Sequence, residues 1–235
     1  MAFIGAAIAW AAAYCTDDVL ENMLEEVSAF GYARIGEREL PQAVQKIDRA
    51  DAQKLQDSVH QAVNLVDFAC QREAGAVRSA EDISTGSEKA RGLITGQLKQ
   101  WEIYSLALRE QILDYGRFKA QQLGTEPPEE PRLSQLEEQH IDTIPSLRSS
   151  VRGQKFNPSQ TEEHESFTAK NPDFIKNLKL DRSQQRAILN YINGRRSVTE
   201  IRNWAMAETG KNLDFEKLIG YLGYLEQIDW ITYDR

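Results

Sequence analysis

Two long segments of the chain carry apolar residues at spacings of three and four, the period that places side chains on one face of an α-helix. They run from residue 55 to 77 and from about residue 87 to 122. Because such a stripe must be buried against another element, the pattern predicts an antiparallel helical bundle. The stripe residues of the first segment are Leu55, Val59, Ala62, Val63, Val66, Ala69, Cys70, Ala76 and Val77, and those of the second are Ile94, Leu98, Trp101, Leu108, Ile112 and Tyr115.

Two more helices are expected before these. The segment 1–15 is Ala-rich, has no positive charge at its start and is too short to span a bilayer, so it predicts a packed helix rather than a signal peptide or membrane anchor. Thr16 and Asp17 can cap an acidic helix that follows, and Pro41 is expected to end or kink that helix near Glu39.

Proline is concentrated in one region, because six of the seven prolines fall between Pro127 and Pro172. That shift in composition predicts a Pro-rich acidic linker over residues 125–164. The linker would separate a helical bundle over residues 1–124 from a smaller domain over residues 165–235.

The smaller domain is predicted to hold three helices. Asp181 can cap the first, Ser197 and Glu200 form a capping box at the start of the second, and Gly210 ends it. A third helix over 214–227 precedes a segment with strand character, 229–233. The predicted fold class is therefore mainly α: a bundle followed by a winged-helix-like domain with a short C-terminal strand or hairpin.

Binding to DNA is the less favoured function for this domain. The third helix would enter the major groove, yet Lys217 is its only basic residue. The chain carries a net charge of −8, and all of the acidic excess lies before residue 165. Nucleic-acid binding relies on clustered Lys and Arg, so no nucleic-acid partner is expected.

No catalytic or metal-ligating set can be assigned from the sequence. The three histidines, His60, His140 and His164, lie outside any zinc-protease or nucleophile motif. His60 follows Asp57 by three residues, but without further ligands a solvated pair is the simpler interpretation. The two cysteines make no disulfide framework; reduced thiols are expected, which favours a cytoplasmic location without establishing it. Whether the chain is an enzyme stays open.

One polar residue interrupts an apolar stripe. Glu73 falls where the Val66, Cys70, Val77 series predicts a hydrophobic residue. A buried carboxylate needs a partner, so we interpret Glu73 as half of a buried ion pair that fixes the register of the bundle. Its candidate partners are Arg72, Arg78, Arg34 and Arg109.

Several segments resemble a known family. "VDFACQREAGAVRSAEDIS" and "LITGQLKQWEIYSLALREQILDYGRF" resemble the helical region after the catalytic domain of bacterial di-zinc aminopeptidases, relatives of the bacterial leucine aminopeptidases and the transferrin receptor. The final "INGRRSVTEIRNWA" and "LDFEKLIGYLGYLEQIDWI" look like the winged-helix tail of such proteins. The family's zinc ligands and general-base Glu have no counterpart here, so zinc is expected only in an attached peptidase domain.

The resemblance implies a non-catalytic accessory region that acts in oligomerisation or in covering a peptidase. Because unpartnered apolar seams would expose large patches, we expect a homodimer that forms through the bundle. The seam residues expected at its interface are Ile94, Leu98, Trp101 and Leu108.

The tail is also similar to the peptide-chaperone winged helices of pyrroloquinoline quinone biosynthesis. Those modules bind a leader peptide as an added strand, with the third helix as the other wall. The alternative function is therefore a stand-alone peptide-binding adaptor. Asp229 departs from the family pattern, which has Gly at this turn. The corresponding groove residues here are Phe215, Leu218, Leu222, Trp230 and Tyr233.

Overall fold

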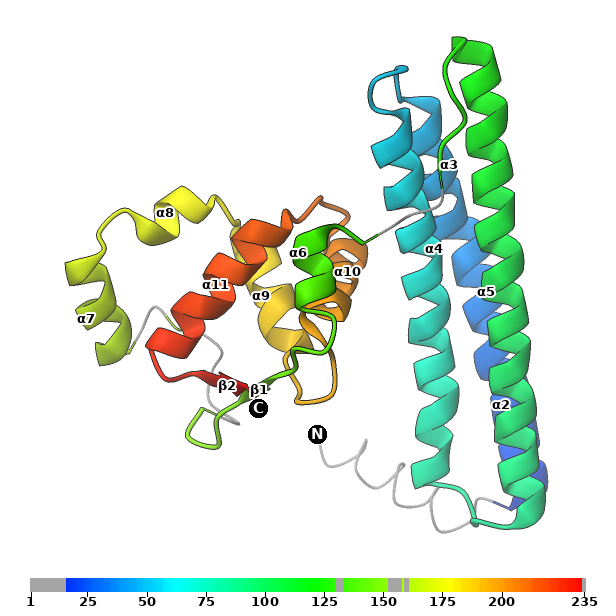
Figure 1. The fold of residues 1–235 in the computed structure, drawn as a ribbon. Helices are drawn as coiled ribbons and strands as arrows, with labels where there is room; N and C mark the ends of the chain where they lie inside the picture. The colour runs from blue at the N-terminus through cyan, green and yellow to red at the C-terminus, as the bar shows by residue number, and fades with distance from the viewer. Residues whose placement is uncertain (1–15, 130–132, 152–157, 159–160, 234–235) are drawn as a thin grey trace. The chain divides into compact units, whose positions relative to one another are not determined.

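The computed structural model describes residues 16–129, 133–151, 158 and 161–233, and the chain divides into two compact units, Met1–Glu130 and Pro131–Arg235. The described part is mainly α-helical, with one small two-stranded antiparallel sheet (Figure 1). The Ala-rich segment 1–15 lies outside the described residues. Within the described ranges, the helices are all too short or too polar to cross a membrane.

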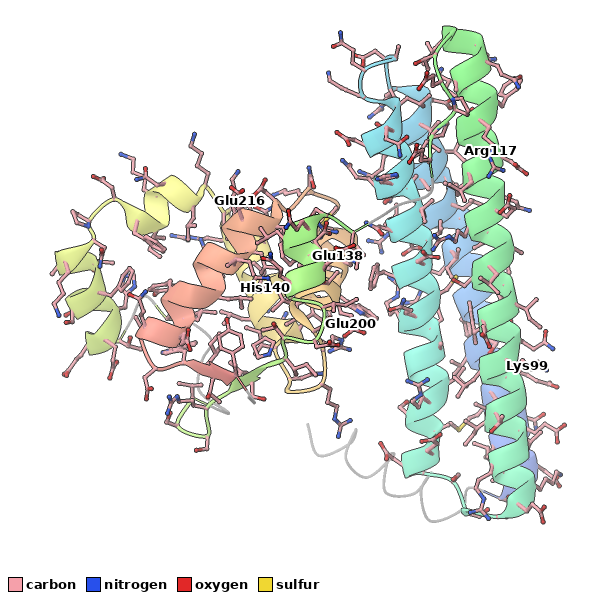
Figure 2. All side chains as sticks on the ribbon, viewed as in Figure 1. Lys99, Arg117, Glu138, His140, Glu200 and Glu216 are labelled. Carbon is pink, nitrogen blue, oxygen red and sulfur yellow. The ribbon has the colours of Figure 1, made fainter. Side chains whose placement is uncertain are left out.

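The first unit is a bundle of long helices that lie side by side (Figure 1). Charged side chains such as Lys99 and Arg117 cover its outer faces (Figure 2). In chain order the elements are α2 (Asp17–Arg34), the π-helix η1 (Ile35–Glu39), α3 (Leu40–Asp48), α4 (Leu55–Arg78), the 3₁₀ turn η2 (Ser79–Asp82) and α5 (Glu88–Leu123).

The predicted Thr16 cap of α2 is confirmed, and α5 is capped at both of its ends. The Thr16 hydroxyl accepts a hydrogen bond from the amide of Val19 at the start of α2. Ser87 caps α5 in the same way through Ala90, and Gly124 ends that helix in the left-handed conformation, at φ 63°. These signals are local, so the sequence alone is enough to locate the ends of the helices.

Pro41 does not end the acidic helix. The chain instead changes to π-helical hydrogen bonding over Ile35–Glu39 and continues as α3, with Pro41 in its first turn. The amide of Leu40 donates to the carbonyl of Ile35. Pro41 thus lies directly after the π-helical turn, in a helix that continues through it.

In the part of the chain that the structure describes, the second unit has seven short helices or strands in addition to α11. In chain order its elements are α6 (Gln135–Gln139), β1 (Pro145–Leu147), α7 (Glu162–Lys170), α8 (Phe174–Leu178), α9 (Arg182–Tyr191), α10 (Val198–Thr209), α11 (Phe215–Gln227) and β2 (Ile231–Tyr233). The Asp181 cap and the Ser197–Glu200 capping box are both confirmed.

The segment 125–164 differs from the linker that its prolines suggest. It contributes α6, β1 and the start of α7 to the described structure. β1 pairs antiparallel with β2, with Ser146 opposite Thr232. Glu137 of α6 forms an ion pair with Arg202 of α10 at 2.5 Å, with side chains only 9% and 17% exposed. The described residues of this segment from 133 onward are therefore part of the second unit, whereas residues 125–129 belong to the first.

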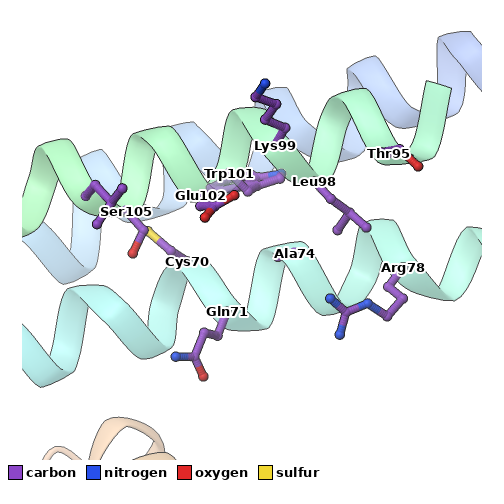
Figure 3. A pocket seen from close by; sticks show the side chains of 11 residues that line it. Cys70, Gln71, Ala74, Arg78, Thr95, Leu98, Lys99, Trp101, Glu102 and Ser105 are labelled. Atoms are coloured by element: carbon purple, nitrogen blue, oxygen red, sulfur yellow. The ribbon is translucent and has the colours of Figure 1, made fainter. Parts of the chain in front are cut away.

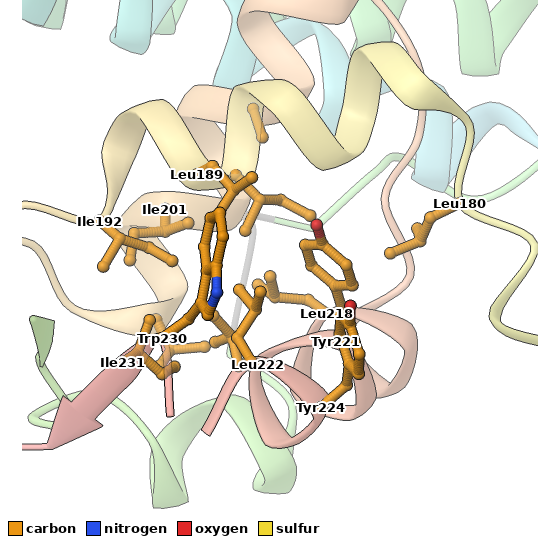
Figure 4. Packing of buried hydrophobic residues seen from close by; sticks show 14 of the residues in the cluster. Leu180, Leu189, Ile192, Ile201, Leu218, Tyr221, Leu222, Tyr224, Trp230 and Ile231 are labelled. Carbon is orange, nitrogen blue, oxygen red and sulfur yellow. The ribbon is translucent and has the colours of Figure 1, made fainter. Parts of the chain in front are cut away.

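A single hydrophobic cluster holds the second unit together (Figure 4). Leu218 and Leu222 of α11 are completely buried, and Trp230 packs beside them. Leu136 and Leu147 of the predicted linker pack against the same cluster. Burying each such side chain stabilises the fold by roughly 1.5–3 kcal/mol, which explains why the segment stays in place.

Candidate functional site

An open groove runs between α4 and α5 on one face of the bundle (Figure 3). Its volume is about 570 Å³. Figure 3 shows Leu98 reaching from α5 toward α4, where the facing residue is the small Ala74. The groove residues are Cys70, Gln71, Ala74 and Arg78 of α4, and Thr95, Leu98, Lys99, Trp101, Glu102, Ser105 and Leu106 of α5.

Exposed apolar side chains lie at this groove. The side chain of Leu106 lines the groove and is 62% exposed, and Ile103 one turn earlier is 52% exposed. Charged Arg78, Lys99 and Glu102 stand at the rim. An apolar floor inside a polar rim is the arrangement typical of a protein-interaction site.

Trp101 forms the floor of the groove and is itself 1% exposed. Gly31 of α2 makes room for it, since a Cβ atom there would lie 2.8 Å from the indole ring. The ring stacks on Tyr32 with centroids 4.3 Å apart, and Tyr104 meets it edge-on at 5.8 Å. The Ser28 hydroxyl accepts a hydrogen bond from the indole N–H.

The Cys70 thiol at the groove has a raised pKa. Burial raises the pKa of the Cys70 thiol to about 11, against a hydrogen bond from Ser105 that lowers it. A raised pKa favours the protonated thiol at neutral pH, the less nucleophilic form. Burial also raises the pKa of nearby Asp67, while Arg109 and Ser105 oppose the shift.

The described residues hold no group of three or more His, Cys, Asp or Glu side chains that could bind a metal ion. Among these residues, the predicted Asp57–His60 pair therefore has no further metal ligand beside it. His60 instead lies beside Gln56 and the backbone carbonyl of Glu129, 3.2 Å away.

Glu73 lies in a network of buried ion pairs. Its carboxylate is 1% exposed and contacts Arg34 of α2 and, at 2.7 Å, its neighbour Arg72. Arg72 also binds the buried Glu39 at 3.0 Å, the last residue of the π-helix. Two of the four candidate arginines thus contact Glu73, and Glu39 is a member that the sequence pattern did not single out.

The seam expected at a dimer interface lies largely inside the chain. Ile94, Trp101 and Leu108 are each at most 4% exposed, packed within the bundle. Leu98 is the member that lines the groove. The chain's own helices bury Ile94, Trp101 and Leu108. These three residues therefore form no exposed apolar seam of the kind on which the homodimer prediction was based.

One end of the same α4–α5 face is covered by the chain itself. After α5, Pro128 is buried near Gly116 and Val59. The side-chain amide of Gln56 makes two hydrogen bonds to the backbone of Glu129, donating to its carbonyl at 3.1 Å and accepting from its amide at 2.9 Å.

The peptide groove predicted in the second unit is not formed by the residues expected to line it. Phe215, Leu218, Leu222 and Trp230 are each at most 7% exposed and belong to the core, with Tyr233 packed against it. These apolar side chains are part of the hydrophobic core of the second unit.

The chain's own β1 lies where a bound strand was expected. It pairs with β2 on one side. On the other side, the amides of Gly194 and Val198 donate to the carbonyls of Pro145 and Thr143 at 3.2 and 2.9 Å. The turn between α9 and α10 thus forms hydrogen bonds with the segment that contains β1.

A comparison of the chain with protein-family models, curated proteins and solved structures finds no match.

Cys70, Leu98 and Trp101 of the groove belong to the predicted apolar stripes, whereas its other residues lie off them. Ala74 and Ala76 flank Gly75 in α4, and a run of small residues leaves space beside a neighbouring helix. Ile103 and Leu106 lie off the apolar stripe of α5, which predicts exposure. Small residues facing an off-stripe leucine are the signal that would have located the groove.

Proposed function

We propose that the chain is a non-catalytic interaction protein that binds a peptide segment of another protein in the α4–α5 groove. The observation that carries the proposal is the groove itself, with Trp101 as its floor, the half-exposed Leu106 at its edge and charged residues at its rim. Aromatic and apolar anchors within a polar border supply most of the energy of protein recognition.

The resemblance to the accessory region of zinc aminopeptidases names one class of partner for this proposal. On that reading the bundle braces or covers a peptidase domain, and zinc belongs to that domain.

A winged-helix-like identity for the second unit is part of the proposal. The order α9, α10, α11 and β2 supports it, with β1 completing the sheet. A peptide-binding adaptor that uses this unit is the weaker alternative, because the chain's own segment already pairs with β2.

The test compares two substitutions of the same residue type on one helix. Ala74 lines the groove, whereas Ala76 is exposed on α4 outside it. Peptides are selected by display against the full chain, and their affinities are measured by calorimetry for the wild type, Ala74→Arg and Ala76→Arg. We expect Ala74→Arg to weaken binding at least tenfold, because the arginine fills the groove, and Ala76→Arg to bind like the wild type.

Two results would overturn the proposal. Selection that yields no binding peptide would remove the function, and equal affinity for both variants would place the site elsewhere on the chain. Circular dichroism of each variant checks that the helices are intact.

A further inference from the structure

We propose that the α4–α5 face recognises extended, proline-containing acidic peptides, and that the open groove takes such a segment from a partner protein. This inference rests on the proposed function and names its ligand class. It is argued from the way in which the same two helices already bind the segment Thr125–Glu129 of their own chain.

At the covered end of the face, the Gln56 side chain binds backbone groups of the chain. The Gln56 side chain presents one acceptor and one donor, and both are used by the amide and carbonyl of Glu129. A side-chain amide paired in this way with a peptide unit is satisfied by any extended segment, since the contact involves no side chain of the ligand.

The ring of Pro128 packs beside Gly116 and Val59. A Cβ atom at Gly116 would lie 3.1 Å from Pro128 and 2.7 Å from Val59, so the ring fits only because position 116 has no side chain. Proline fixes φ near −65° and keeps the residue before it extended. The segment therefore loses little conformational entropy when it docks.

The open groove is the continuation of this face. His60 and Gln71 are eleven residues apart on α4, about three turns, so both lie on one side of that helix. Gly116 and Ser105 have the same separation on α5. A ligand seated beside Ser105 therefore contacts the same surface of α4 and α5 that already holds Pro128.

The dimensions and charge of the groove suit a short acidic chain. From Thr95 to Leu106 the groove follows α5 for about 16 Å, the reach of about five extended residues. Arg78 and Lys99 at its rim outnumber Glu102. The segment already bound in cis, "TEPPE" (Thr125–Glu129), is also acidic.

The experiment uses two peptides and the full chain. The first is Thr-Glu-Pro-Pro-Glu-Glu-Pro, and the control replaces each proline with alanine. Each is titrated into the wild type, Ala74→Arg and Ala76→Arg while the indole N–H signal of Trp101 is followed by NMR, with Trp101→Phe used only to assign that signal. We expect the proline peptide to shift the signal in the wild type and Ala76→Arg, and to bind at least tenfold more weakly to Ala74→Arg.

The control peptide is expected to bind at least tenfold more weakly than the proline peptide to the wild type. If the two peptides bind equally, or if display-selected helical peptides bind while the proline peptide does not, the ligand class is wrong and the proposed function stands. If no peptide of any kind binds, the proposed function itself fails. Self-association of the chain in sedimentation equilibrium that Ala74→Arg abolishes would also overturn the inference, because the occupant would then be a second copy.

Discussion

At the scale of single residues, Glu73 shows how far a pattern can be interpreted. A carboxylate inside an apolar stripe predicts a buried ion pair, and the structure gives Glu73 two arginine partners. The identity of those partners depends on how α2 crosses α4, which no local pattern encodes. Glu39 joins the network through Arg72, and one of its carboxylate oxygens finds no hydrogen-bond partner among the described residues.

We predict that Glu73→Leu lowers the free energy of unfolding by about 2 kcal/mol. Arg34 and Arg72 are 48% and 40% exposed, so each can turn partly toward water, which keeps the loss below that of a fully buried pair. Adding Arg34→Leu should recover part of the loss. Urea unfolding measures both variants, with the exposed Glu26→Leu as a control expected to stay within about 0.5 kcal/mol of the wild type. A single mutant as stable as the wild type would show that the pair is not structural.

At the scale of elements, the turn between α11 and β2 adopts a conformation that suits glycine. Asp229 has φ +62°, in the left-handed region where side chains other than Gly, Asn and Asp are strained. The Asp229 carboxylate binds Arg148 at 2.9 Å, but both side chains are about half exposed or more.

We predict that Asp229→Gly raises the free energy of unfolding by about 0.5 kcal/mol, because relief of the strained φ exceeds the loss of an exposed ion pair. Asp229→Ala should lower it by about 1 kcal/mol, since it loses the ion pair and keeps the strain. Thermal unfolding of the two variants measures both effects. Equal melting temperatures would mean that the turn relaxes without cost.

Elements fixed by neighbouring residues were predictable, and elements fixed by distant ones were not. Thr16, Gly124 and the Ser197–Glu200 box mark helix ends within a few residues of themselves. β1 exists because it pairs with residues near the end of the chain, so its prolines suggested a linker instead. A local signal was present nevertheless, because Ser134 and Glu137 form a capping box at the start of α6.

At the scale of the whole molecule, the sequence predicted a bundle and a smaller helical domain, and the chain does divide into two compact units. The boundary lies at residues 130 and 131, and α6 and β1 belong to the second unit. The peptide and DNA hypotheses concern that second unit, whereas the open groove lies on the first.

We predict that the purified chain binds no stoichiometric zinc and hydrolyses no aminopeptidase substrate with zinc added. The reason is that the described residues lack a cluster of metal ligands. Elemental analysis and a chromogenic aminopeptidase assay test this, and a melting temperature unchanged by a chelator is the matching stability measurement. One zinc ion per chain, or chelator-sensitive unfolding, would contradict it.

The pairing of β1 with β2 sets a condition on biosynthesis. Leu147 meets Ile231, so the sheet joins an early part of the unit to nearly its last residues. Contacts between such distant segments form late and slowly. β1 can therefore pair only after Ile231–Tyr233 has left the ribosome, and a nascent chain stalled before Ile231 holds β1 without its partner strand.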